Sequence, residues 1–128
     1  MNGEDVHTLA DRIFKAIEAK DLVGIRSCYH DDATIWHNYD GHAQTVEENL
    51  SLLQRLCGLA SSLRYTEVDR ITNATGFVQR HVLEVQVGEC VVRIPACLVV
   101  EADTGRIRRI YEYMDSAHRA RLYAHASQ

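Results

Sequence analysis

The chain has 128 residues, a mass of 14.5 kDa and a formal net charge of −4 at pH 7. Its length predicts one domain over residues 1–128 with a core and a small pocket, because chains of this size bury roughly two thirds of the surface that they expose when unfolded. The acidic balance argues against nucleic acid as a partner, since phosphate binding needs a basic surface. No apolar run approaches the ~20 residues that span a bilayer, so no membrane partner is expected.

The cysteines and histidines bear on metal binding and on the cell compartment. The cysteines form no Cys-x-x-Cys pair and the histidines no i, i+4 pair, so neither a zinc site nor a redox motif is expected. The first twenty residues are charged and amphipathic, unlike a secretory leader. These patterns predict a cytoplasmic protein with reduced thiols. The cysteines are Cys28, Cys57, Cys90 and Cys97.

The first half of the chain has the period of amphipathic helices. Apolar residues recur at helical spacing near the start, and Asp21 can cap a shorter helix that follows. A short strand carries Trp36 and His37, and a further helical stripe comes after it. The expected elements of this half are a helix at 5–19, a helix at 22–29, a turn at 30–32, a strand at 33–38, a turn at 40–41 and a helix at 45–59.

The second half changes to the alternating period of strands. Glycine-containing turns separate four β-rich runs, which indicates an antiparallel meander. Helices followed by such a meander predict an α+β fold, with the helices packed on one face of a curved sheet. Pro95 cannot donate a hydrogen bond, so a bulge, a bend or an edge position is expected there. The expected elements are strands at 63–72, 76–87, 90–102 and 106–114, and a helix from 115 to about 124.

Glu112 is the most informative residue of the last strand. Successive strand side chains point to opposite faces, so Glu112 shares a face with Ile110 and Met114. A carboxylate between two large apolar side chains is either an ion pair with an arginine of a neighbouring strand, such as Arg80, or a general acid or base in a dry site. The pattern leaves both interpretations open.

Two further strands carry polar residues of interest. His37 shares a face with Ile35, where a histidine is either a hydrogen-bonded core residue or a base or donor. Arg80 and His81 occupy opposite faces of the 76–87 strand, and either face could line a cavity. The face with His81 is the more apolar one.

Four segments together resemble a known family. They are AKDL at 19–22, YHDDATIWH at 29–37, DTGRI at 103–107 and YEYMD at 111–115. Their order and spacing are similar to those of the SnoaL-like group, within the superfamily of nuclear transport factor two, ketosteroid isomerase and limonene-epoxide hydrolase. The resemblance implies an α+β cone, in which a strongly bent antiparallel sheet encloses a hydrophobic cavity, and a homodimer formed through the sheet.

The resemblance can be followed position by position. His37 falls where ketosteroid isomerase has its proton-abstracting aspartate, whereas Ile13 and Cys97 replace both oxyanion donors, which argues against that activity. Compared with limonene-epoxide hydrolase, Glu112 matches one aspartate and Arg80 the arginine, whose aspartate partner is Val82 here. Glu112 also lies near the single pocket carboxylate of SnoaL-type cyclases.

The same alignment implies that Arg80, Glu84 and Glu112 face the cavity and that His81 faces the outer sheet surface. The resulting hypothesis is a cofactor-independent isomerase, cyclase or hydrolase acting on a small, largely apolar molecule. Glu112 would be the general acid/base, His37 a second acid/base or orienting donor, and Arg80 an electrostatic clamp. The expected ligand-contacting residues are Trp36, Tyr29, Glu84, Cys97, Ile110 and Met114.

Two other functions stay open at this point, because this fold hosts many activities. The chain could be a non-catalytic binding protein, in which the polar groups only orient a small ligand. It could also be a dimerisation or assembly module with a filled core. The sequence does not name the substrate or the reaction.

Overall fold

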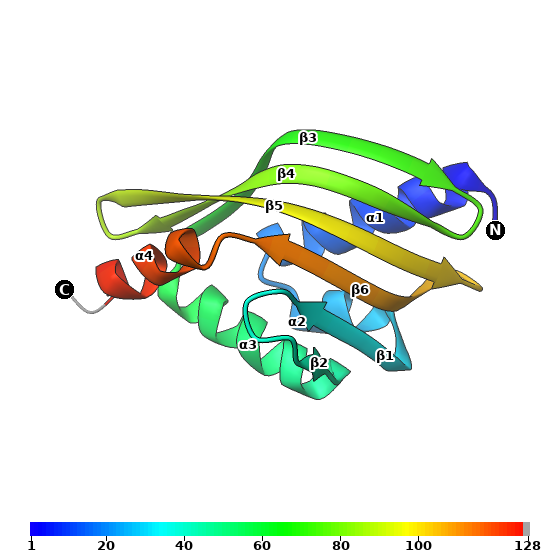
Figure 1. The fold of residues 1–128 in the computed structure, drawn as a ribbon, viewed down its shortest axis with the longest axis horizontal. Helices are drawn as coiled ribbons and strands as arrows, with labels where there is room; N and C mark the ends of the chain where they lie inside the picture. Colours follow the sequence, from blue (N-terminus) through cyan, green and yellow to red (C-terminus); the bar gives the residue numbers. More distant parts are fainter. Residues whose placement is uncertain (127–128) are drawn as a thin grey trace.

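The computed structural model describes residues 1–126 and contains four helices and six strands (Figure 1). The helices lie at both ends of the chain and between the second and third strands. The strand-rich second half matches the expected meander closely. The elements are α1 (Gly3–Glu18), α2 (Leu22–Ser27), β1 (Tyr29–His37), β2 (Ala43–Gln44), α3 (Val46–Leu59), β3 (Ser62–Asn73), β4 (Gly76–Val87), β5 (Cys90–Asp103), β6 (Arg106–Met114) and α4 (Ser116–Ala126).

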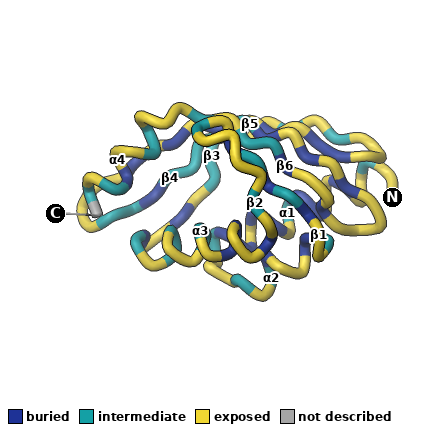
Figure 2. The backbone as a smooth tube through the Cα atoms, turned by 60° about the horizontal axis from the view of Figure 1, so that its bottom comes forward, coloured by how far each residue is buried: buried dark blue, intermediate teal, exposed yellow. Residues whose placement is uncertain are grey.

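The strands form one curved sheet in the order β2-β1-β6-β5-β4-β3. All neighbours are antiparallel except β1 and β6, which run parallel. Helices α1, α2 and α3 cover one face of this sheet, and α4 lies beside its end (Figures 1 and 2). The α+β cone expected from the sequence is therefore confirmed.

Local signals explain where the first helices begin. Asn2 and Asp5 form a reciprocal capping box at the start of α1, and Thr45 and Glu48 form another at the start of α3. Asp21 caps α2 by accepting a hydrogen bond from the backbone N–H of Gly24 at 3.0 Å. Such caps satisfy backbone donors that have no partner within the helix.

One segment that was expected as a turn is part of a strand, and the short strand β2 was not expected. Residues 30–32 belong to strand β1 rather than to a turn, and the strand already begins at Tyr29. The pairing of β1 with β6 shifts between Tyr29 and Thr34, so the intervening residues form an irregular, bulge-like stretch that exposes Asp31 and Asp32. The polar residues of this stretch have the sequence pattern of a turn, which explains why a turn was expected.

Pro95 occupies a position that suits its missing N–H. It pairs with Val82 on β4, but the pairing of β5 with β6 ends one residue later, at Ala96 opposite Met114. Pro95 therefore pairs with β4 on one side and has no paired strand on the other. It lies at a local sheet edge, which was one of the expected alternatives.

No helix within residues 1–126 is long and apolar enough to cross a membrane.

Candidate functional site: an apolar cavity with a histidine–glutamate pair

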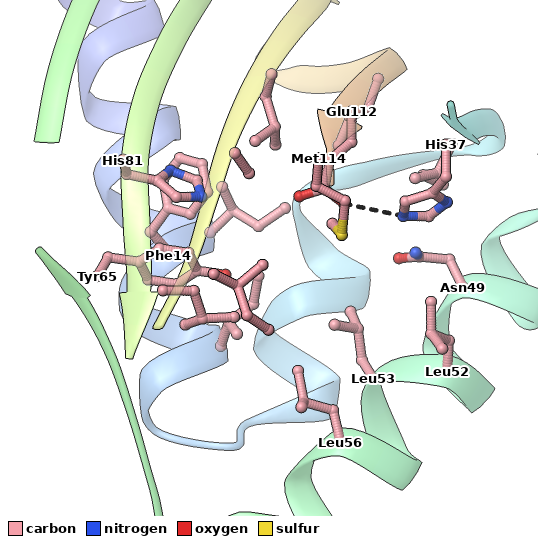
Figure 3. A pocket seen from close by; sticks show the side chains of 18 of the residues that line it. Phe14, His37, Asn49, Leu52, Leu53, Leu56, Tyr65, His81, Glu112 and Met114 are labelled. Atoms are coloured by element: carbon pink, nitrogen blue, oxygen red, sulfur yellow. Dashed lines mark ion pairs between the residues drawn. The ribbon is translucent and has the colours of Figure 1, made fainter. Parts of the chain in front are cut away.

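A cavity of about 120 Å³ lies between the inner face of the sheet and helices α1 and α3, with α4 contributing at one end (Figure 3). Most of its lining is aliphatic or aromatic, and a few polar side chains project into it. The polar and aromatic lining residues are Phe14, Tyr29, His37, Tyr39, Asn49, Tyr65, Phe77, His81, Glu112, Arg119 and Tyr123. The aliphatic lining includes Ile13, Ile17, Leu53, Leu56, Leu98, Ile110 and Met114.

Glu112 and His37 form the central polar contact of the cavity. Glu112 pairs with His37 across the parallel β1–β6 ladder, and the Nε2 atom of His37 lies 2.9 Å from the Oε1 atom of Glu112 (Figure 3). The His37 side chain is 4% exposed and that of Glu112 is 20% exposed. The carboxylate thus sits in an apolar cavity, held by one partner, and retains some access to a bound molecule.

The surroundings of His37 indicate where its proton lies. Its Nδ1 atom is buried and has no hydrogen-bond partner within residues 1–126. Nδ1 is therefore unsatisfied in either tautomer and does not decide the position of the proton. A carboxylate oxygen accepts, so the Nε2 atom that faces it is the donor. This hydrogen bond holds the carboxylate of Glu112 in place.

Tyr29 and Asn49 form a second buried polar contact that ties β1 to α3. The Tyr29 hydroxyl donates to the Oδ1 atom of Asn49 at 3.0 Å, and the amide of Asn49 donates to the Oε1 atom of Gln44 at 3.2 Å. Burial raises the pKa of Tyr29, and the negative charge of Glu112 raises it further. The hydroxyl of Tyr29 therefore keeps its proton and fixes the wall beside Glu112.

His81 projects into the cavity from β4, beside the rings of Phe14 and Tyr65 (Figure 3). Its ring centroid lies 5.5 Å from that of Phe14 and 4.7 Å from that of Tyr65, both in edge-to-face geometry. Burial lowers the pKa of His81 to about 4, against a smaller opposing effect of Glu112. His81 is therefore uncharged at neutral pH. Burial also raises the pKa of Tyr65 well above its ordinary value.

Aromatic and cationic groups from the loop after β1 and from α4 complete the lining. The guanidinium carbon of Arg119 lies 4.4 Å from the ring centroid of Tyr39 and 5.0 Å from that of Tyr123. The Tyr39 ring lies 5.1 Å from the ring of His37. A chain of stacked groups thus connects α4 to the histidine–glutamate pair.

The structure brings together five of the residues expected at the site. Glu112, His37, Tyr29, Ile110 and Met114 all line the cavity. Glu112 does share its face with Ile110 and Met114, as the alternation of the strand predicted. Their roles in binding or catalysis stay predictions.

The expectation that Arg80, Glu84 and Cys97 face the cavity is wrong. Arg80 is on the outer face, where its side chain is 75% exposed and pairs with Asp69 at 3.0 Å. Glu84 forms an ion pair with Arg93, also outside the cavity. Arg80 and Cys97 are directly opposite each other on β4 and β5, so these errors have one cause. The expectation exchanged the inner and outer faces of these two strands.

The residues next to Arg80 and Cys97 on these two strands therefore face the cavity. His81 pairs with Ala96, and both line the cavity, whereas His81 was expected on the outer face.

Trp36 was expected to contact the ligand but lies outside the cavity lining. It packs against Tyr111 and Tyr113, and its ring centroid lies 6.0 and 5.3 Å from theirs.

Sequence reasoning missed several cavity residues. His81 could have been found from the greater apolarity of its strand face, but the family alignment overruled that signal. Asn49, Tyr65 and Arg119 had no local signature, because each reaches the cavity through the packing of distant elements. No cluster of three or more histidine, cysteine, aspartate or glutamate side chains able to hold a metal ion occurs in the described part of the chain.

The chain resembles several solved structures in fold. A protein from Shewanella putrefaciens classed as a SnoaL-like polyketide cyclase is 15% identical, with a TM-score of 0.77 over 92% of this chain and 84% of that one. An NTF2-like protein from Burkholderia xenovorans is 14% identical, with a TM-score of 0.75 over 95% and 98%. An LEH-like epoxide hydrolase from M. tuberculosis is 17% identical, with a TM-score of 0.72 over 97% and 92%.

Sequence comparison adds no closer relative. No family model matches the chain, and no curated protein matches it significantly. At identities this low the structural likeness concerns the fold and not the activity. The chain therefore has the α+β cone fold of SnoaL-like and NTF2-like proteins.

Proposed function

We propose that this protein is an acid/base enzyme acting on a small, largely apolar molecule bound in the cavity. The observation that carries the proposal is the Glu112–His37 pair, with a distance of 2.9 Å between Nε2 and Oε1 inside an apolar cavity. A carboxylate is costly to remove from water, so an apolar site with a single hydrogen-bond donor is a poor place for a purely structural charge. It is a good place for a base.

Each residue of the pair has a distinct task. Glu112 accepts a proton from the bound molecule or from a water beside it, and it returns that proton at a later step. His37 donates from Nε2 throughout and so keeps the carboxylate pointing into the cavity. If the proton comes from carbon, the reaction is an isomerisation or cyclisation; if it comes from water, the reaction is a hydrolysis. This chemistry needs only side chains, and Arg80 takes no part in it.

The cavity limits what can bind. An engineered apolar cavity of ~150 Å³ holds benzene, so a cavity of about 120 Å³ suits a molecule near the size of one ring. The aliphatic walls favour a mostly hydrocarbon skeleton. The similarity in fold to an LEH-like epoxide hydrolase and to a protein classed as a polyketide cyclase supports cyclic ketones and epoxides as the first molecules to test.

The test uses the nearly isosteric substitution Glu112→Gln, which removes the base. Two probes separate the possible reactions: exchange of the α-hydrogens of cyclohexanone in deuterated water, and hydrolysis of cyclohexene oxide. We expect the wild-type protein to accelerate at least one of them and Glu112→Gln to reduce that rate at least 100-fold, the usual contribution of a positioned base. Retained activity in Glu112→Gln would contradict the proposal.

Glu84→Gln is the matched control. Glu84 is also a strand carboxylate with a side-chain partner, which is Arg93, but it lies outside the cavity. Its substitution should leave the rate unchanged. A second function, non-catalytic binding, is favoured if the wild-type protein binds both probes in the cavity and converts neither. The predominantly apolar lining is compatible with that outcome.

A further inference from the structure

A chain of hydrogen bonds fixes the proton of His81. Arg70 donates from Nε to the Oε1 atom of Gln79 at 2.7 Å, and the Nε2 atom of Gln79 lies 2.8 Å from the Nδ1 atom of His81. Arginine only donates, so the oxygen of Gln79 must face Arg70 and its NH₂ group must face His81. The NH₂ group donates, hence Nδ1 of His81 accepts. The proton of the neutral ring is therefore on Nε2.

The chain of hydrogen bonds is anchored outside the cavity. The side chain of Arg70 is 8% exposed, and its guanidinium also pairs with Asp11 at 2.8 Å. Gln79 is fully buried. Each hydrogen bond thus has a fixed donor and a fixed acceptor, from the carboxylate of Asp11 at the surface to the imidazole of His81 in the cavity.

Within residues 1–126 His81 forms its side-chain hydrogen bond through Nδ1, and its Nε2 atom is not one of the fully buried polar atoms that lack a partner, so Nε2 keeps some open surface although the residue as a whole is only 3% exposed. The neighbouring groups that face the ring are aromatic, namely Phe14 and Tyr65. The ring projects into the cavity (Figure 3). A donor that faces a largely apolar cavity gains a hydrogen bond when a bound molecule offers an acceptor. The lowered pKa of His81, about 4, keeps the group from becoming a cation at neutral pH.

We propose that His81 is a specificity-determining residue whose Nε2–H donates a hydrogen bond to an uncharged oxygen of the ligand, such as a ketone, ether or epoxide oxygen. This inference rests on the proposed function, because it assumes that the cavity binds the substrate. Glu112 and His81 lie on β6 and β4, with β5 between them, so their strands are roughly 10 Å apart across the sheet. The ligand would therefore present hydrocarbon to most of the wall, its oxygen to His81 and its reacting hydrogen or water to Glu112.

The first measurement needs no ligand. Nitrogen NMR of histidine-labelled wild-type protein at pH 7 reports which ring nitrogen of His81 carries the proton. We expect the Nε2–H form. Gln79→Leu removes the donor to Nδ1, so the ring should then populate both forms. A wild-type ring protonated on Nδ1, or on both nitrogens, would overturn the proposal.

The second measurement compares two probes of the same shape. Cyclohexanone offers an oxygen acceptor, and methylenecyclohexane replaces that oxygen with a CH₂ group. Their dissociation constants are obtained from shifts of cavity resonances in NMR titrations. We expect His81→Phe to weaken cyclohexanone binding roughly three- to tenfold, the range of one neutral hydrogen bond, and to change methylenecyclohexane binding less than about twofold.

Arg80→Gln is the control, because Arg80 is next to His81 on the same strand but points away from the cavity. It should alter neither titration. Equal effects of His81→Phe on both probes would contradict the role of His81 and leave the role of Glu112 intact. If neither probe shifts the cavity resonances of the wild-type protein, the cavity does not bind such molecules and both proposals fail.

Discussion

At the scale of single residues, two histidines in one cavity have different roles because of their partners. His37 donates from Nε2 to Glu112, and its Nδ1 has no partner among residues 1–126. His81 accepts from Gln79 at Nδ1 and directs Nε2 toward the cavity. One histidine is therefore committed to a protein carboxylate, whereas the other has a donor to offer to a ligand.

The burial of His81 predicts how stability depends on pH. Its pKa falls from 6.5 in the unfolded chain to about 4 in the folded protein. Between these values the unfolded state binds the extra proton, so the free energy of unfolding decreases as the pH falls from about 6.5 to about 4. The full effect is on the order of 3 kcal/mol, since one pKa unit corresponds to ~1.4 kcal/mol.

The measurement is urea denaturation at several pH values from 7 to 4. His81→Phe has no ionisable group at this position, so its free energy of unfolding should fall less steeply over this range than that of the wild-type protein. Comparing the two proteins removes the contributions of the other histidines. Parallel pH profiles would show that His81 is not shielded from protons in the folded state.

At the scale of elements, the sequence predicted the strands of the second half well. The boundaries of β4 and β6 match the expected runs, because glycine-containing turns mark both ends of β4 and the start of β6. The parity of β4 was harder to predict, since apolar residues lie on both of its faces: Phe77 and Leu83 line the cavity, while Val78 is exposed on the other side. Alternation alone cannot separate two apolar faces, and the alignment chose the wrong one.

The site was predictable where the local pattern was unambiguous. Glu112 stands between two large apolar residues on one strand, so its face could be identified. Asn49 and Arg119 are brought to the cavity by α3 and α4, whose placement depends on contacts between elements far apart in the chain. No local pattern reports such contacts.

The turn between β3 and β4 offers a prediction about an element boundary. Gly76 begins β4 beside β5, and an added Cβ atom would lie 1.9 Å from the carbonyl oxygen of Val100. Backbone must move to accept it, so Gly76→Ala should lower the free energy of unfolding by about 1–3 kcal/mol or more. Urea denaturation measures this change.

Gly58 in α3 provides the contrasting substitution. No atom lies within 4 Å of a Cβ atom added there. Gly58→Ala should therefore raise stability by up to ~1 kcal/mol, because alanine is the better helix former. A similar loss in both variants would show that steric contact with β5 is not the cause.

At the scale of the whole molecule, the outer face of the sheet carries an apolar stripe. The stripe consists of residues that are in register across five strands, which are Ile71, Val78, Val99, Tyr111 and Trp36. Ile71 is 75% exposed, Val78 41% and Val99 38%. Contiguous exposed apolar surface of this kind often marks an interface. We propose that a second copy of the chain covers the stripe through a two-fold axis, which brings the same surface of both copies together.

Light scattering coupled to size-exclusion chromatography tests this proposal. We expect the wild-type protein to be a dimer and Val99→Glu to be a monomer, because the substitution places a charge at the centre of the stripe. Val91→Glu is the control, since Val91 is 53% exposed but lies near the β4–β5 turn, away from the stripe. A monomeric wild-type protein, or a dimer that Val99→Glu does not weaken, would contradict the proposed interface.

The parallel pairing of β1 with β6 has a consequence for how such a protein can diversify. It sets the separation of His37 and Glu112 through backbone hydrogen bonds of the sheet, independently of the helices. Helices α1 and α3 supply part of the aliphatic wall, and α4 supplies the Tyr123 and Arg119 end of the cavity. Substitutions in the helices can therefore reshape the cavity for a new molecule while the Glu112–His37 pair keeps its geometry. Under the proposed function, substrate preference and reaction chemistry can then evolve separately in this chain.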